Sequence, residues 1–119
     1  MDKIYMNRME FYGYHGVYAE ENKLGQRFYV DLTLELDLKR AGESDALVHT
    51  INYADVYKIT KEVVEGEPYK LVESVAETIA AKLLASFEPL QFVTVTVTKP
   101  DPPIPGHYDS VAVEITRSK

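Results

Sequence analysis

The sequence predicts an α+β domain in which two helices cover one face of a four-stranded antiparallel sheet. Two observations predict this class. Four segments alternate between apolar and polar residues, which is typical of half-buried strands, and two central segments repeat their apolar residues with the helical period. Their order along the chain is β-β-α-α-β-β, and each strand has one apolar face that helices could cover. A chain of 119 residues is the usual size of one domain, so we expect residues 1–119 to form a single domain.

The first strand is expected over residues 3–12. Its apolar positions fall into two pairs, which are Ile4 and Met6, then Met9 and Phe11. The spacing between the pairs is odd, so the parity changes at Asn7-Arg8. An extra residue at that point predicts a β-bulge.

The second strand is predicted over residues 28–38, where every second residue is apolar and every other one is polar. It should pair antiparallel to the first strand. Two shorter alternating segments, residues 93–97 and 111–115, close the chain. The outer face of the former is a row of threonines, Thr94, Thr96 and Thr98. This row could be a solvated sheet face, or it could line the inside of a larger assembly.

Two helices are predicted in the middle of the chain. The first begins after Asn52, a favoured N-cap residue with Asp55 in a capping-box-like position, and ends before Gly66. The second covers residues 71–87 and is stopped by Pro89. Their apolar stripes are, in the first, Tyr53, Val56, Tyr57, Thr60, Val63 and Val64, and in the second, Val72, Val75, Ala76, Ile79, Leu83 and Phe87.

Composition and charge exclude several classes of protein. The net charge is −6 and no lysine- or arginine-rich run occurs, so nothing indicates a nucleic-acid or anionic-membrane partner. The absence of cysteine removes disulfides, thiolate metal sites and cysteine nucleophiles. The three histidines are scattered and form no metal-binding motif, so we expect no metal. Because the chain shows neither a signal peptide nor a membrane-spanning run, we expect a cytoplasmic protein.

A proline-rich segment at residues 98–110 contains four of the six prolines and begins with Lys99 at a strand end. Lys99 continues the parity of the apolar row, so its amine should lie on the helix-covered side. Desolvation there would favour the neutral amine, which can act as a general base. Pro100 restrains Lys99 to an extended conformation. The alternatives are a strand-end lysine that extends to water and an ordinary hairpin loop.

Three other side chains could carry chemistry. Glu73 lies in the first turn of the second helix, where a carboxylate is favoured and could accept two hydrogen bonds from a flat ligand such as an amino-pyrimidinone. It could equally do no more than balance the helix dipole. Glu21 lies in the loop between the first two strands, and charge alone does not distinguish it from Glu20. Tyr53, at the first helical turn, could relay a proton or pack in the core.

Five blocks occur in a defined order: FYGYHGV, EENKLGQRFYVDL, INYADV, LVESVAETIA and TKPDPPIPGHYDSVAVEI. Together they resemble the dihydroneopterin aldolase family over nearly the whole chain, from Tyr5 to Arg117. The resemblance implies the tunnelling fold, in which four protomers form a β-barrel ring and two rings stack into a homo-octamer. Active sites would then lie between adjacent subunits, and the threonine row would face the tunnel.

The resemblance also implies a reaction. The family cleaves 7,8-dihydroneopterin by a retro-aldol step to 6-hydroxymethyl-7,8-dihydropterin and glycolaldehyde, in folate biosynthesis. The ring imine of the substrate accepts the electrons of the breaking bond, so neither a cofactor, a metal nor a Schiff base is expected. Epimerisation to dihydromonapterin can use the same enol intermediate, so one protein could carry out both reactions.

Carried over by position, the resemblance implies a role for each candidate residue. Glu73 would anchor the pterin N–H groups, with backbone hydrogen bonds near Val72. Lys99 would be the general acid/base, and Glu21 would hold Lys99 or the substrate hydroxyls. Tyr53, from a neighbouring subunit, would assist proton transfer at the enol carbon. Further residues would shape the pocket, namely Tyr14, His15 and the PPIPGH loop.

Three rival functions use the same kind of scaffold or ligand. An epimerase specific for the triphosphate should offer a basic pocket, whereas the proline loop supplies only Lys99. A zinc-dependent pyruvoyl-tetrahydropterin synthase needs three clustered histidines, which this sequence lacks. A non-catalytic pterin-binding or ring-forming protein would keep Glu73 and tolerate the loss of Lys99.

Overall fold

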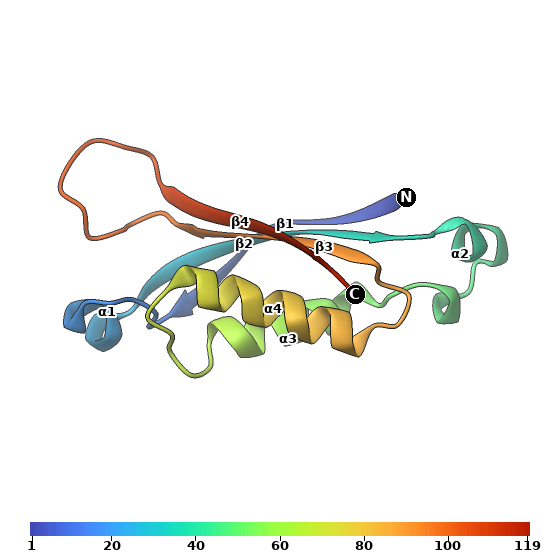
Figure 1. Cartoon of the computed structure of the whole chain (residues 1–119), viewed down its shortest axis with the longest axis horizontal. Helices are drawn as coiled ribbons and strands as arrows, with labels where there is room; N and C mark the ends of the chain where they lie inside the picture. The colour runs from blue at the N-terminus through green and yellow to red at the C-terminus, as the bar shows by residue number, and fades with distance from the viewer.

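The computed structural model describes all of residues 1–119 and contains one antiparallel sheet with the strand order β1-β2-β3-β4. Helices α3 and α4 lie together on one face of this sheet, and the other face is open (Figure 1). The predicted order and α+β class are therefore confirmed. The elements are β1 (Asp2–Gly13), α1 (Ala19–Leu24), β2 (Gln26–Leu36), α2 (Lys39–Ser44), a 3-10 turn (Leu47–His49), α3 (Tyr53–Val64), α4 (Val72–Ser86), β3 (Phe92–Lys99) and β4 (Val111–Ser118).

The two long strands differ from each other in regularity, as predicted. The β1–β2 register shifts between Met6 and Met9, and Arg8 has a φ of 48°, so the bulge is confirmed. The second strand ends at Leu36, two residues earlier than predicted. The physical reason is a turn in which the Asp37 carboxylate accepts a hydrogen bond from the backbone N–H of Lys39 at 2.9 Å, which starts helix α2.

Helix α3 begins where its cap predicts, because the Asn52 side chain accepts a hydrogen bond from the backbone N–H of Ala54 at 2.9 Å. Asp55 makes no hydrogen bond back to that cap, so the predicted capping box is not formed. Tyr53 and Tyr57 belong to the predicted apolar stripe but are exposed, whereas the other four stripe residues are buried. Tyr53 is therefore not a core residue of the single chain.

The core lies between the sheet and the helices α3 and α4. It is a single cluster of 20 buried residues, and burying each large aliphatic side chain contributes about 1.5–3 kcal/mol. Strands β2 and β3 supply the central row, which consists of Phe28, Val30, Leu32, Leu34, Leu36, Val93, Val95 and Val97. The inward residues of the edge strand β4, Val113 and Ile115, are only half-buried.

The threonine row lies on the open face of the sheet. Thr94 shares a 2.9 Å hydrogen bond with Thr116, and Thr96 donates one of 3.0 Å to Glu114, so the row is tied to strand β4. These bonds are compatible with both a solvated face and a tunnel lining. Enclosure of this face by a ring stays a prediction.

Within the fold, His15 joins two loops. It is fully buried, its Nε2–H donates to the backbone carbonyl of Val64 at 2.6 Å, and its Nδ1 accepts from the backbone N–H of Tyr69 at 2.9 Å. Since a backbone N–H can only donate, Nδ1 carries no proton and the ring is the neutral Nε2–H tautomer. Burial lowers the pKa of His15, against the opposing effect of the bond to Val64, and the charge of Lys99 lowers it further.

Helix length and hydropathy test whether a helix of the chain could cross a membrane. The longest helix, α4, has 15 residues, and none combines the length and hydropathy that crossing a membrane requires.

The lowered pKa of His15 predicts acid-sensitive stability. The unfolded chain binds more protons than the folded one once the pH falls below about 6.5, the ordinary histidine value. The free energy of unfolding should therefore be fully retained above that pH and should decline below it, by at most about 1.4 kcal/mol per pH unit for one proton. Urea unfolding followed by circular dichroism between pH 7.5 and 5.5, at fixed protein concentration, measures this decline.

Replacing the histidine at position 15 should remove this component of the pH dependence. His15→Asn should flatten the decline between pH 7.5 and 5.5, whereas His107→Asn, in the exposed loop before β4, should keep it. Equal slopes in all three proteins would show that His15 does not control the acid response.

Candidate active site

A cavity of about 230 Å³ lies at one end of the sheet, where β3 runs into the proline loop. We call it the Lys99 cavity. Helix α1, the start of α4 and the β3–β4 loop gather at this end of the molecule (Figure 1). Half of its twelve lining residues are apolar. The twelve residues come from segments 17–21, 70–73 and 102–111 and from Lys99 at the end of β3.

The central contact in this cavity is an ion pair between Lys99 and Glu21. The Lys99 Nζ lies 2.7 Å from the Glu21 Oε2, and the two side chains are 15% and 7% exposed. The inward position of Lys99 is thus confirmed, and the alternative of a lysine extended into water is wrong. Glu21, not the exposed Glu20, is the buried acid, and it lies in helix α1 where an open loop was expected.

The surroundings of Glu21 fix its carboxylate. Its Oε2 also accepts from the Gln26 side chain at 2.9 Å, and its Oε1 accepts from the backbone N–H of Tyr18 at 3.2 Å. Residue 16 must be glycine here, because a Cβ at Gly16 would lie 2.3–2.6 Å from the carboxyl atoms. Burial acts to raise the pKa of Glu21, but the hydrogen bonds from Lys99, Gln26 and Tyr18 together with the charge of Lys99 outweigh it and lower the pKa.

The lowered pKa keeps Glu21 ionised at neutral pH, so its carboxylate accepts a hydrogen bond from the Lys99 Nζ. The sequence-based expectation for Lys99 rested on desolvation alone. In the structure its Nζ has a carboxylate partner and lies at the cavity, where it can exchange a proton with a bound ligand.

Glu73 and Val72 line the same cavity from the first turn of α4. The Glu73 side chain is exposed and makes no hydrogen bond or ion pair within the chain. No side chain caps the N-terminus of α4, so N–H groups of its first turn are also free to bind a ligand. The arrangement can hold a flat ligand that presents adjacent N–H donors and an acceptor.

Three residues that the resemblance assigned to the site do not line this cavity. Tyr53 is 65% exposed and begins α3, at the opposite end of that helix from the loop leading to α4 (Figure 1). Tyr14 and His15 are also absent from the lining, and His15 is buried with both ring nitrogens bonded. A contribution of Tyr53 from a neighbouring subunit stays a prediction.

The proline loop forms one wall, through Pro102, Pro103 and Ile104. The Tyr108 hydroxyl lies 3.0 Å from the backbone carbonyl of Pro102 and also contacts that of Ile104, and Arg27 forms an ion pair with Asp101 at 2.8 Å. These cross-links favour a preorganised wall over a simple hairpin connection. Sequence reasoning missed the partners of this loop, because their positions in the sequence carry no pattern.

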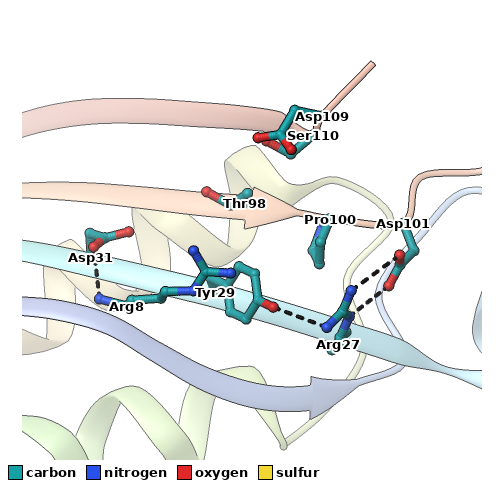
Figure 2. Close-up of a pocket in the computed structure, with 9 residues that line it drawn as sticks. All are labelled: Arg8, Arg27, Tyr29, Asp31, Thr98, Pro100, Asp101, Asp109 and Ser110. Carbon is teal, nitrogen blue, oxygen red and sulfur yellow. Dashed lines mark hydrogen bonds and ion pairs between the residues drawn. The ribbon is translucent and has the colours of Figure 1, made fainter. Parts of the chain in front are cut away.

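The largest cavity, of about 520 Å³, lies elsewhere, on the open face of the sheet. Figure 2 shows that most of its charged side chains already have partners: Arg27 pairs with Asp101, Asp31 accepts a hydrogen bond of 2.8 Å from the backbone N–H of Arg8, and the Arg8 guanidinium lies over the Tyr29 ring. None of the predicted acid/base residues lies there. Nowhere in the chain do three potential metal-binding side chains converge.

Comparisons with a family model and with known proteins all match the chain to dihydroneopterin aldolases. The family model described as dihydroneopterin aldolase matches residues 4–116. The dihydroneopterin aldolase of Bacillus subtilis is 66% identical over 119 residues, which is 100% of this chain and 99% of that protein. That of Staphylococcus epidermidis is 50% identical over 116 residues, covering 98% of this chain and 96% of the relative.

Solved structures agree with the predicted fold. The E. coli dihydroneopterin aldolase in complex with neopterin has a TM-score of 0.91 at 30% identity and covers 99% of this chain and 100% of its own. The Burkholderia thailendensis dihydroneopterin aldolase bound to guanine has a TM-score of 0.81 at 27% identity, with 99% and 91% covered. With a family model and close relatives that span nearly its whole length, the chain belongs to the dihydroneopterin aldolase family.

Proposed function

We propose that this protein is a 7,8-dihydroneopterin aldolase, which releases 6-hydroxymethyl-7,8-dihydropterin and glycolaldehyde in folate biosynthesis. The observation that carries the proposal is the meeting of a buried Lys99–Glu21 ion pair and an unpaired Glu73 at one cavity. Membership of the family supports the same reaction. Residues 1–119 would act as one domain.

The pterin ring would bind against the first turn of α4. Neopterin and guanine, the ligands named for the E. coli and Burkholderia structures, both contain an amino-pyrimidinone ring. Such a ring presents an amino group next to a ring N–H, and the Glu73 carboxylate can accept both hydrogen bonds. Backbone groups near Val72 would bind the same edge. Hydrogen bonds to a charged group contribute about 1.5–3 kcal/mol each, so Glu73 would dominate affinity.

Cleavage would break the bond between the first and second carbons of the substrate side chain. The hydroxyl on the second carbon loses its proton, and the bonding electrons move into the ring imine, whose nitrogen gains a proton. Lys99, held in place by Glu21, would donate a proton to that nitrogen and then, as an amine, accept the hydroxyl proton. Glu21 can also bind the hydroxyls of the side chain.

The enol that remains on the ring must then take up a proton at its side-chain carbon and release the proton from the ring nitrogen. Tyr53 of a neighbouring subunit would assist this step. Because the enol can add back to the other face of the glycolaldehyde carbonyl, which inverts the second side-chain carbon, the proposal includes an epimerase side activity giving dihydromonapterin.

This use of Tyr53 requires an assembly, and we include the octamer of two rings in the proposal. Strands β1 and β4 are the two edges of the sheet, and each leaves backbone groups unpaired on its outer side. Side-by-side joining of protomers would pair these edges. It would also bring exposed residues of one chain, such as Tyr53, to the cavity of the next.

The activity itself is tested by an assay for glycolaldehyde. Purified protein should release glycolaldehyde from 7,8-dihydroneopterin, and EDTA should leave the rate unchanged because the ring imine accepts the electrons. Borohydride added during turnover should trap no adduct in the mass spectrum. Loss of activity with EDTA, or a substrate-sized adduct on Lys99, would contradict the mechanism.

Removal of the acid/base should separate binding from catalysis. Lys99→Ala should reduce turnover by at least about 100-fold, the usual scale for general acid/base loss, while the Kd for neopterin changes by only a few-fold. Lys61→Ala, on the exposed side of α3, is the matched control and should keep normal turnover. Normal turnover in Lys99→Ala would remove Lys99 from the mechanism.

Removal of the charge on the ring anchor should act mainly on affinity. Glu73→Gln keeps the shape but loses one acceptor oxygen and the charge, so the Kd for neopterin should rise about 10- to 100-fold. Isothermal titration calorimetry measures this change. Glu77→Gln, one turn further along α4 and paired with Arg117, should bind normally. Unchanged affinity in Glu73→Gln would mean that the ring binds elsewhere.

A further inference from the structure

We infer that His15 is a positioning residue that sets the distance between the ring anchor Glu73 and the Lys99–Glu21 pair. It does so by locking the loop that leads into α4 onto the turn that leads into α1. The inference rests on the proposed function, because it assigns His15 a role in pterin binding by the same site.

The two walls of the Lys99 cavity come from distant parts of the chain, residues 17–21 and 70–73. Three hydrogen bonds join the segments that carry them, and each involves His15 or Gly16. They are the two bonds of the His15 ring and a bond of 2.9 Å from the backbone N–H of Gly16 to the carbonyl of Tyr69. No other hydrogen bond connects residues 14–25 with residues 64–73.

The loop between α3 and α4 has little else to hold it. Glu67, Pro68 and Lys70 are exposed, and Tyr69 is the residue of this loop that His15 and Gly16 bind. Tyr69 lies only two residues before Leu71, the N-cap of α4. Two residues span about 7 Å of extended chain, so a displacement at Tyr69 passes almost directly to the first turn of α4.

The His15 ring itself has no freedom to move. It stacks on the Tyr69 ring with 5.9 Å between centroids, and it meets the Phe28 ring edge-on at 5.3 Å. Its two nitrogens bond in different directions, one as donor to α3 and one as acceptor from the loop. An apolar side chain of similar size could fill the space but would leave the carbonyl of Val64 and the N–H of Tyr69 unpaired in the interior.

His15 is buried and does not line the cavity, as expected of a residue that acts by positioning others. Glu21 lies five residues beyond Gly16 on one side of this lock, and Glu73 lies four residues beyond Tyr69 on the other. The Lys99–Glu21 pair depends on β3 and α1 and does not pass through the His15 bonds. Loosening the lock should therefore move Glu73 relative to a pair that stays in place.

The test uses the full chain with three variants that remove the two hydrogen bonds of the His15 ring one at a time or together. His15→Asn can keep an acceptor near Nδ1 for the N–H of Tyr69, His15→Gln can keep a donor near Nε2 for the carbonyl of Val64, and His15→Ala keeps neither. Calorimetry gives the Kd for neopterin, and the glycolaldehyde assay gives KM and kcat. Val93→Ala, a buried truncation at the opposite end of β3 from Lys99, is the control for lowered stability alone.

The expected order of neopterin affinity is wild type, then His15→Asn within about threefold, then His15→Gln and His15→Ala weakened about tenfold or more. KM should follow the same order. Val93→Ala should lower the Tm but keep the wild-type Kd. If His15→Ala does not fold, the order of the Asn and Gln variants decides the matter.

Folded His15 variants with wild-type Kd and KM would overturn the inference, as would weaker binding in His15→Asn than in His15→Gln. Failure of the wild type to release glycolaldehyde would instead contradict the proposed function. The neopterin measurements would still test the role of His15 in that case.

Discussion

The candidate site depends on one interaction, the ion pair of Lys99 and Glu21 in a largely dry position. Burying two charges is costly, and a buried pair is often no more stabilising than apolar residues of the same size. Here the cost is reduced by two further donors to Glu21, from Gln26 and from the backbone of Tyr18, and the absence of a side chain at Gly16 leaves room for the carboxylate. A fold that needed only stability could omit this arrangement, which supports a chemical purpose for it.

The fold brings the parts of the site together from separate segments. The regular register of β3 places Lys99 at the end of the inward row, and the β1–α1 turn delivers Glu21. The start of α4 delivers Glu73, and α4 itself is seated on the core by a buried stripe. Because β3, α1 and α4 are each anchored independently, the distance between Lys99 and Glu73 depends on the hydrogen bonds that hold the intervening loops.

Elements with a long repeat could be predicted from the sequence, and contacts between distant segments could not. The strands, the bulge and the Asn52 cap follow from local patterns. Helices α1 and α2 have six residues each, too few to show a period. The choice of Glu21 over Glu20 depends on Gln26 and Gly16, and the bonds of His15 span 49 and 54 residues, so only the folded chain reveals them.

In the proposed function the single chain supplies an anchor, a proton carrier and one wall of the site, but not a closed site. The Lys99 cavity holds about 230 Å³, which is small for a bicyclic ring with a three-carbon side chain. Tyr53 stands exposed at the far end of α3, and both edges of the sheet are open. One joining of protomers would close the edges, enlarge the cavity with a second chain and bring a phenol to it. In the proposed assembly the same neighbour would therefore satisfy three separate features of the monomer, and catalysis and assembly would arise from one interface.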